Sequence, residues 1–269
     1  MLCTATQPLL DQLRTPEKGQ LVIPKENELV SDVPKLFEDL ERVKLNNMIR
    51  PEGWTKEQIA ELALDEFNKL SSCLIIVNTK VWAQQLYQVL QSEVDEDNIF
   101  QLSTNLCPAH RKTILAKVRH RLGENQSVLC ISTQLIEAGV DVDFASVIRF
   151  LAGLDSIAQA AGRCNRNGLR EMAEVHVVNP SEEKIDLLKD IKTGRDKAQR
   201  IFDEGFDNFL APDAIKQYFN YYFYDRAEEM SYPVSSKNLG RDDDLLNLLS
   251  NNSKNVGRNK QSILLQQSF

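Results

Sequence analysis

The stretch VLCISTQLIEAGVDVDFASVIRFL (residues 128–151) decides the fold. It contains two apolar runs, VLCIST (128–133) and SVIRFL (146–151), that are nearly continuous rather than alternating. Continuous apolar runs of this length are typical of strands that are buried on both faces of a sheet. Between them, QLIEAG is long enough for about one and a half helical turns, which would end at Gly139. We therefore predict a strand, a short helix and a second strand in the interior of an α/β protein.

Further apolar runs on both sides of this stretch predict three more strands: CLIIVN (73–78), NIFQLS (98–103) and EVHVVN (174–179). The segments 80–93 and 109–122 carry apolar residues at spacings of three and four, as amphipathic helices do. The alternation of strands and helices predicts βαβ units on a parallel sheet.

The rest of the chain predicts a different organisation at each end. Residues 9–36 contain proline, glycine and mixed charge, which favours a linker, and residues 54–70 predict a helix capped by Thr55. After about residue 180, helical patterns at 181–204 and 211–225 follow without a strand between them. The polar segment SNNSKNVGRNKQS (250–262) is typical of a loop or a disordered segment. We expect an α/β domain followed by a partial helical C-terminal region.

Composition excludes several classes of protein. The formal net charge of −7 argues against attraction of the whole molecule to nucleic acid, although backbone amides and hydroxyls can still make local contacts. The five cysteines form no C-x-x-C pair, and their odd, scattered set fits a reducing cytoplasm. No apolar segment approaches the roughly 20 residues that a membrane span needs, and we expect a cytoplasmic protein without membrane contact.

The three histidines do not predict a metal site. His110 and His120 have no acidic or histidine partner at a useful spacing. His176 alternates with two valines in a predicted strand, which favours a structural role. We therefore predict no metal ligand in the chain.

Polar residues follow the predicted central strand. Ligands bind outside the carboxyl ends of the strands in doubly wound sheets, so Thr133 can offer a hydroxyl or an amide to a phosphate. Asp141 and Asp143 are two residues apart, and in an extended segment both carboxylates would lie on one face. Taken alone, the stretch is explained more simply by a strand end, a glycine cap and two solvated acids.

The segment QAAGRCNR (159–166) brings two arginines close together. In a helix, four of its residues would share one face: Gln159, Gly162, Arg163 and Arg166. Arginine presents a planar fork of donors that suits phosphate oxygens, and an arginine finger stabilises the charge that develops during phosphoryl transfer. The alternative is a surface helix whose arginines pair with Glu137 or Glu171. Because only 30 residues separate Thr133 from Arg163, we expect both stretches along the same edge of one sheet.

Several motifs together resemble those of superfamily 2 helicases. STQLIEAGVDVDF (132–144) is similar to motif V and QAAGRCNR to motif VI, while LCTATQP (2–8) resembles motif III and LIIVNTK (74–80) stands where motif IV belongs. LSTNLCPAHRK (102–112), EAGVDVDF and GLDSIAQAAGRCNRNG resemble the narrower family of CRISPR-associated helicase–nucleases of type I systems. The matched motifs span residues 2–168.

This resemblance implies a fold and a set of site residues. In such helicases two RecA-like domains close on ATP, and the second domain supplies arginines, here Arg163 and Arg166. Gln159 would help to orient the nucleotide, and Gly139 and Asp141 would approach the ribose or the arginines. The implied contacts to a nucleic-acid backbone are Asn78, Thr79, Ser103, Thr104, Arg111 and Thr133. Thr4 and Thr6 would couple the nucleotide state to the grip on DNA.

The resemblance also implies partners that these 269 residues do not contain. The chain has no G-x-x-x-x-G-K-[ST] motif, no acid run before motif III and no histidine–aspartate nuclease cluster. We expect residues 1–30 to end the first RecA-like domain and form a linker, residues 31–180 to form the second RecA-like domain, and residues 181–269 to form a helical accessory region, truncated at its end. ATP and Mg²⁺ would be held mainly by the N-terminal helicase domain, so the chain alone is expected to be inactive.

The implied function is the second half of an ATP-dependent 3′–5′ single-stranded DNA translocase in CRISPR interference. Its implied partners are single-stranded DNA, a CRISPR surveillance complex, and N-terminal helicase and nuclease domains. Two alternatives stay open: another superfamily 2 helicase that acts on RNA or DNA, and a non-catalytic module whose arginine pair docks an acidic segment of a partner.

Overall fold

The computed structural model describes residues 30, 32–137, 139–226, 233–234 and 243–244. Thr4, Thr6 and the polar segment 250–262 lie outside the described residues. Among the residues described, 34–137 and 139–215 belong to one compact unit, and residues 30, 32–33, 216–226, 233–234 and 243–244 belong to a second. The first unit carries all the other candidate residues.

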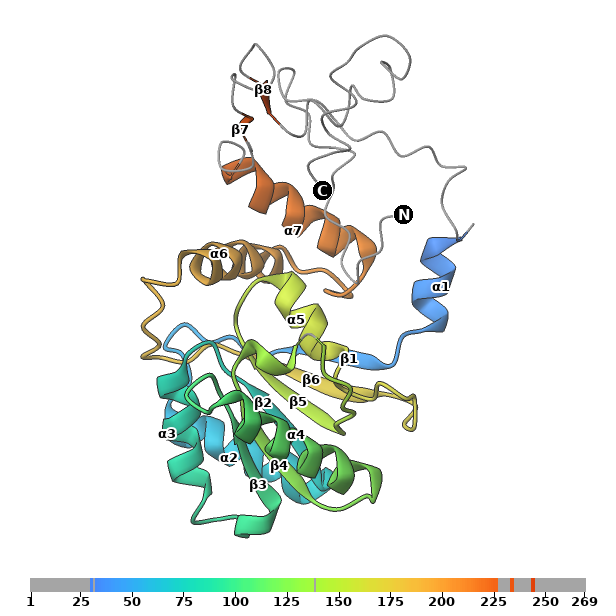
Figure 1. The fold of residues 1–269 in the computed structure, drawn as a ribbon. Coiled ribbons are helices and arrows are strands. Elements are labelled where there is room, and N and C mark those ends of the chain that lie inside the picture. The colour runs from blue at the N-terminus through green and yellow to red at the C-terminus, as the bar shows by residue number, and fades with distance from the viewer. Residues whose placement is uncertain (1–29, 31, 138, 227–232, 235–242, 245–269) are drawn as a thin grey trace. The chain divides into compact units, whose positions relative to one another are not determined.

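A six-stranded parallel sheet forms the centre of the first unit (Figure 1). Its strands are β1 (Val43–Asn47), β2 (Ser72–Ile76), β3 (Ile99–Leu102), β4 (Val128–Ser132), β5 (Ser146–Phe150) and β6 (Ala173–Val178). Their order across the sheet is β1-β6-β5-β2-β4-β3, and every pairing is parallel. The α/β fold and its five predicted strands are thereby confirmed.

Helices cover both faces of this sheet. On one face α2 (Lys56–Leu70) and α3 (Lys80–Leu90) enclose a core around Cys73, Ile75 and Ile148. On the other face α4 (Pro108–Gly123) and α5 (Leu154–Ala161) enclose a core around Leu74, Ile76 and Val147. Because residues 74, 75 and 76 alternate between the two cores, β2 is buried on both faces, which is why its sequence is continuously apolar.

The predicted helices form, although the one expected over 181–204 begins only at Lys189. Thr55 caps α2 in a capping box: its hydroxyl accepts from the Gln58 backbone nitrogen, and the Gln58 side chain accepts from the Thr55 nitrogen. The last helix of the unit, α6 (Lys189–Glu204), packs against α5. The remaining elements are α1 (Val33–Asp39), two 3₁₀ turns (Glu96–Asn98 and Gln134–Ile136), α7 (Pro212–Asp225), and the short antiparallel strands β7 (Pro233–Val234) and β8 (Asp243–Asp244).

Further local features differ from the prediction. Residues 33–36, expected in a linker, begin α1 instead, because proline is tolerated in the first turn of a helix, where backbone N–H groups have no partner within the helix. β1 is a strand that the sequence did not predict. It lies at the edge of the sheet, where only one neighbour pairs with it, so its sequence VKLNN can carry polar residues.

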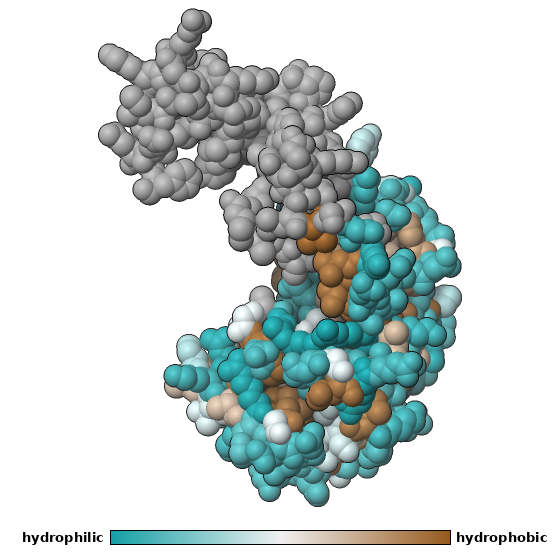
Figure 2. Space-filling model, turned by 90° about the vertical axis from the view of Figure 1, so that its right-hand side faces the viewer, coloured by the Kyte–Doolittle hydropathy of each residue, from teal (hydrophilic) through white to brown (hydrophobic). Residues whose placement is uncertain are grey.

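The surface of the described residues is mostly hydrophilic on the face drawn in Figure 2, with hydrophobic side chains gathered in a few patches between polar ones. None of the described helices is both long enough and apolar enough to cross a membrane.

Candidate nucleotide and nucleic-acid site

The carboxyl ends of three neighbouring strands bring together three of the predicted site residues. Ile76, Ser132 and Leu102 are partners in register across β2, β4 and β3, so Asn78, Thr133 and Ser103 follow them at one edge of the sheet. Backbone hydrogen bonds extend the pairing beyond the strands, since the Val77 nitrogen donates to Ser132 (2.9 Å) and the Thr133 nitrogen to Leu102 (3.1 Å). Parallel strands therefore gather these polar residues where the sequence predicted.

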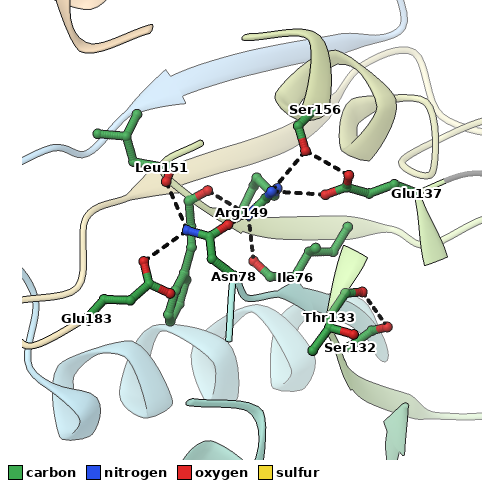
Figure 3. Close-up of polar contacts among 10 residues, drawn as sticks. Ile76, Asn78, Ser132, Thr133, Glu137, Arg149, Leu151, Ser156 and Glu183 are labelled. Carbon is green, nitrogen blue, oxygen red and sulfur yellow. Dashed lines mark hydrogen bonds and ion pairs between the residues drawn. The ribbon is translucent and has the colours of Figure 1, made fainter. Parts of the chain in front are cut away.

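Asn78 is buried at this edge, and its side chain is already engaged (Figure 3). Its Nδ2 donates to the Leu151 carbonyl (3.0 Å) and to Glu183 Oε2 (2.9 Å), while its Oδ1 accepts from Arg149 (2.7 Å). Both donor hydrogens are used, so the side chain positions the strand end and has no free donor for a nucleic-acid strand.

The other residues expected on the nucleic-acid face differ in exposure. Ser103 and Thr133 are buried and Thr104 is exposed. The Ser103 hydroxyl accepts from the Asn105 nitrogen (3.3 Å), which leaves its own O–H free to donate. Thr79 caps α3, where its hydroxyl accepts from the Trp82 nitrogen (3.3 Å). A hollow of about 380 Å³ opens beside Ser103 and is lined on the α3 side by Tyr87 and several glutamines.

Arg111 lies in the first turn of α4, which begins at Pro108. Its side chain is partly buried, and its Nε has no hydrogen-bond partner within the described chain. Buried polar groups are normally hydrogen-bonded, so a guanidinium with an unpaired nitrogen at a helix start is suited to an anion.

The loop after β4 is tighter than the sequence predicted. In place of about one and a half helical turns there is a single 3₁₀ turn, Gln134–Ile136. Gly139 has a left-handed backbone (φ 70°), and a Cβ placed on it would meet no atom within 4 Å. The glycine is required by its backbone conformation, and the space beside it is open to a ligand.

The two arginines do not share a helix face, contrary to the expectation from their spacing. α5 ends at Ala161, and the segment after it turns, which separates the two side chains. Arg163 is buried with 8% exposure, and it donates from Nε to the Ile136 carbonyl (2.9 Å), from Nη1 to Gly162 (3.3 Å) and from Nη2 to the Glu137 carbonyl. Burial, followed by the charge of Arg166, lowers the pKa of the Arg163 guanidinium. Arg163 therefore ties the 3₁₀ turn to the end of α5.

Arg166, by contrast, is exposed. Its Nε lies 3.1 Å from Asp141 Oδ1, and the exposed fractions of the two side chains are 43% and 80%. Asp143 accepts hydrogen bonds from the backbone nitrogens of Arg166 (2.8 Å) and Asn167 (3.0 Å). Both acids therefore face the same turn, as their spacing predicted, but only Asp141 meets the guanidinium.

The arginine turn lies near the amino end of β5 rather than along the edge that holds Thr133. Phe144 donates to the Arg163 carbonyl (2.9 Å) and accepts from the Asn165 nitrogen (2.9 Å), two residues before β5 begins. The expectation of one shared edge was wrong because α5 leaves the carboxyl end of β5 and carries the chain back to its amino end. Gln159 is half-buried near the end of α5, and the loop 139–143 links the two locations.

Two residues that the sequence did not single out hold the arginine turn in place. Asn165 is buried with a positive φ of 47°, and its Nδ2 donates to the carbonyls of Arg42 (3.0 Å) and Arg170 (2.7 Å). The Arg42 Nη1 in turn donates to the Arg166 carbonyl (2.8 Å). The turn is therefore fixed to the segment that leads into β1.

Sequence reasoning also missed a buried cation, Arg149 of β5, which Figure 3 shows at the centre of a polar network. Arg149 lies 3.0 Å from Glu137 Oε1 and donates to the Ser156 hydroxyl (2.9 Å), which donates to Glu137 Oε2 (2.7 Å). Burial raises the pKa of the Glu137 carboxyl, and the charge of Arg149 opposes that shift. The signal was present, since an arginine inside the apolar run SVIRFL needs a buried partner.

The sheet topology, the polar strand ends and the arginine turn bound to the preceding loop define a RecA-like α/β domain of the helicase type. Residues 69–169 match the sequence model of a family described as CRISPR-associated nuclease/helicase Cas3, C-terminal. The match covers this part of the chain only, and it confirms the resemblance to the family.

Known proteins agree with this assignment. The chain is 35% identical over 104 residues to a CRISPR-associated nuclease/helicase Cas3 from Methanothermobacter thermautotrophicus, which covers 39% of the chain and 12% of the relative. It is 26% identical over 121 residues to an ATP-dependent helicase Lhr-Core from Sulfolobus acidocaldarius, covering 43% of the chain and 14% of the relative. The crystal structure of T. fusca Cas3-ATP shares the fold of this chain, with a TM-score of 0.54, 19% identity, and coverage of 79% of this chain and 27% of that one. The chain thus matches only a small part of each of these proteins.

Proposed function

We propose that this chain is the second RecA-like half of an ATP-dependent 3′–5′ single-stranded DNA translocase that acts in CRISPR interference. The observation that carries the proposal is the exposed guanidinium of Arg166, on a turn that is bound to the motif V loop of a Cas3-type domain. An exposed arginine on a rigid turn can meet phosphate oxygens that another domain presents.

The two arginines have different tasks in this proposal. Arg163 uses its guanidinium on three backbone carbonyls and is therefore a positioning residue. Within the described part of the chain, Arg166 pairs with the exposed carboxylate of Asp141, and such surface pairs contribute at most about 1 kcal/mol. A phosphate that carries more charge than Asp141 can take its place, so Arg166 is the arginine finger.

The residues present fit one side of a nucleotide site. The space beside Gly139 is open, and Asp141 and Gln159 lie on the segments that adjoin the arginine turn. The 269 residues contain no P-loop, so a partner domain would provide the phosphate cradle and hold Mg²⁺. The bound nucleotide supplies the phosphoryl group, and this chain supplies Arg166 to stabilise the charge on it.

The carboxyl edge of β2, β3 and β4 is proposed to track a nucleic-acid backbone. Thr133, Thr104 and the hydroxyl of Ser103 offer uncharged donors there, and Arg111 offers a cation at a helix start. Such contacts read the backbone without sequence preference and need little positive charge overall, which reconciles the proposal with a net charge of −7. Asn78 and Thr79 support this edge through the strand end and the α3 cap.

The proposal extends to residues and partners outside the described structure. Thr4 and Thr6 would couple the nucleotide state to the grip on DNA, as their motif III position implies. A CRISPR surveillance complex would bring the enzyme to its target in the cytoplasm, as the resemblance to the family implies.

The test is to join the chain to a P-loop-bearing first domain of a Cas3 protein and to measure ATP hydrolysis with single-stranded DNA. We expect DNA to stimulate turnover, and Arg166→Ala to lower kcat by about 10³-fold or more, the usual effect of removing an arginine finger. The matched control is Lys117→Ala, which removes an exposed cation from α4 and should leave turnover unchanged. Unaltered turnover of Arg166→Ala would refute the role of Arg166.

The likeness to Lhr-Core favours a second candidate, a superfamily 2 helicase with another nucleic-acid substrate. The same joined protein separates the two, because hydrolysis that responds to RNA but not to DNA would support this second function.

A further inference from the structure

A polar cluster unrelated to the helicase site lies on the other face of the sheet, beneath α2. Glu174 and His176 are two residues apart on β6, so their side chains lie on one face. Glu66 of α2 reaches them from the covering helix. One potential ligand atom from each of the three residues lies within 4.8 Å of the others.

The spacing in this cluster is too long for good hydrogen bonds. His176 Nε2 lies 3.4 Å from Glu66 Oε2 and 3.7 Å from Glu174 Oε2, whereas N–H···O bonds have heavy-atom distances of about 2.7–3.2 Å. Nε2 is buried and makes no hydrogen bond within the described chain. The side chains of His176 and Glu66 are only 7% and 8% exposed, so water does not readily compensate for the missing partner.

The distances from His176 Nε2 to the two carboxylates are close to those between ligands of one ion, and one ligand atom of each residue lies within 4.8 Å of the others. Bonds of about 2.0–2.2 Å from zinc to nitrogen and oxygen place tetrahedral ligand atoms roughly 3.3–3.5 Å apart. Octahedral Mg²⁺, with bonds of about 2.0–2.1 Å, would bring neighbouring ligands to roughly 3 Å and prefers oxygen. We propose that Glu66, Glu174 and His176 bind a Zn²⁺ ion, which goes beyond the proposed helicase function.

The surroundings of the cluster suit such an ion. Glu66 uses Oε2 toward His176, while its Oε1 lies 3.8 Å from Lys69, so it would bind the ion through one oxygen. The Glu174 side chain is 55% exposed, which gives the ion a path from solvent and leaves the fourth position to water. The two carboxylates balance the charge of a divalent cation, and His176 binds as the neutral ring.

Asn46 on the neighbouring strand β1 orients the ring. It is the register partner of His176, and its side-chain amide lies 3.4 Å from Nδ1. When Nε2 binds the ion, Nδ1 carries the hydrogen and donates it to the Asn46 carbonyl oxygen, which requires the amide to turn over. Zinc-binding histidines characteristically donate their second nitrogen to such an acceptor. The ion would thereby join α2 to the two strands β6 and β1.

The experiment titrates Zn²⁺ into the full chain, purified without a histidine tag, by calorimetry and follows thermal unfolding with and without a chelator. We expect one ion per chain, a rise in Tm that the chelator reverses, and no comparable effect of Mg²⁺. Glu174→Gln should weaken Zn²⁺ binding at least about tenfold, because even residues that only support metal ligands cost 10–100-fold when removed. Glu174 is half-exposed, so this variant should fold; His176→Gln should have the same effect on binding.

The matched control is Glu61→Gln, which removes an exposed carboxylate from α2 away from the cluster and should bind Zn²⁺ as the unmodified chain does. Binding of Co²⁺ should give the intense visible bands of tetrahedral coordination in the chain and the control but not in Glu174→Gln. Absence of Zn²⁺ binding, or equal binding by Glu174→Gln and Glu61→Gln, would overturn the proposal and leave His176 as a partner of two carboxylates in a simple charge cluster.

Discussion

Two arginine–carboxylate pairs with nearly equal N···O distances involve the loop that follows β4. Arg149 and Glu137 approach to 3.0 Å with side chains 0% and 7% exposed, and Arg166 and Asp141 approach to 3.1 Å with side chains 43% and 80% exposed. The acids are only four residues apart in the sequence. The comparison shows that burial, not contact distance, decides what a charged pair does in this domain.

Burial makes the first pair part of the fold. Taking both charges out of water is costly, and the cost is offset because Asn78, Ser156 and the Phe150 carbonyl accept hydrogen bonds from Nη1 and Nη2 of Arg149, although its Nε has no partner among the described residues. The exposed pair loses little by separating, since water solvates both partners. Arg149 therefore fixes the loop, and Arg166 stays available to a ligand.

The largest predicted effect breaks the buried pair. Arg149→Met should lower the free energy of unfolding by about 3–5 kcal/mol, because it leaves the buried Glu137 carboxylate without its cation. Arg166→Met is the comparison and should cost at most about 1 kcal/mol. Urea denaturation followed by circular dichroism measures both.

Equal losses for the two variants would show that burial does not separate the pairs. The double variant Arg149→Met/Glu137→Leu sharpens the result. If the unpaired carboxylate causes the loss, removing it as well should restore part of the stability, and the coupling energy of the cycle measures the pair.

Arg163 tests the intermediate case, a buried cation that bonds to carbonyls instead of a carboxylate. Arg163→Met should cost about 2 kcal/mol, because the carbonyls of Ile136 and Glu137 lose a charged donor. The control is Arg119→Met: Arg119 donates Nε to the Asp141 carbonyl (3.0 Å) of the same loop but is exposed, so the loss should be under about 1 kcal/mol. Thermal unfolding compares them, and a loss in Arg163→Met no larger than in Arg119→Met contradicts the assigned role.

The sequence predicted the fold where a single physical signal dominated. Strands such as CLIIVN were predictable because burial on both faces leaves a continuous apolar run, and α2 because its cap and periodicity agree. β1 was not predictable, since an edge strand pairs on one side only and tolerates lysine and asparagine. Parallel pairing alone predicted that the carboxyl ends of β2, β4 and β3 meet at one edge of the sheet.

The site was predicted less completely, because its geometry depends on contacts between distant segments. The spacing of Arg163 and Arg166 predicted one helical stripe, but α5 ends before them, and the turn buries one and exposes the other. The cluster of Glu66 with His176 joins residues 110 positions apart, so no local spacing could reveal it. His176 was therefore interpreted as a structural residue of a strand.

The smallest predicted effect is a pH dependence of the free energy of unfolding, which comes from a buried carboxyl group. Burial raises the pKa of the Glu183 carboxyl, and the hydrogen bond from Asn78 opposes this shift. The folded chain therefore holds this proton more tightly than the unfolded chain, whose glutamates titrate near about pH 4.3. As pH rises above that value the folded state binds more protons than the unfolded state, so the free energy of unfolding decreases until the folded-state pKa is passed.

Glu183→Gln keeps an acceptor for Asn78 and cannot ionise, so its stability should decrease less steeply than that of the unmodified chain as pH rises from about 4 to 7. The control Glu182→Gln removes an exposed carboxylate one residue earlier and should leave the slope unchanged. Urea midpoints at several pH values give the slopes. Because Glu137 remains in both variants and its pKa is also raised by burial, a residual decrease should persist in Glu183→Gln. A slope equal to that of the unmodified chain would mean that ionising Glu183 costs no more free energy in the folded state than in the unfolded state.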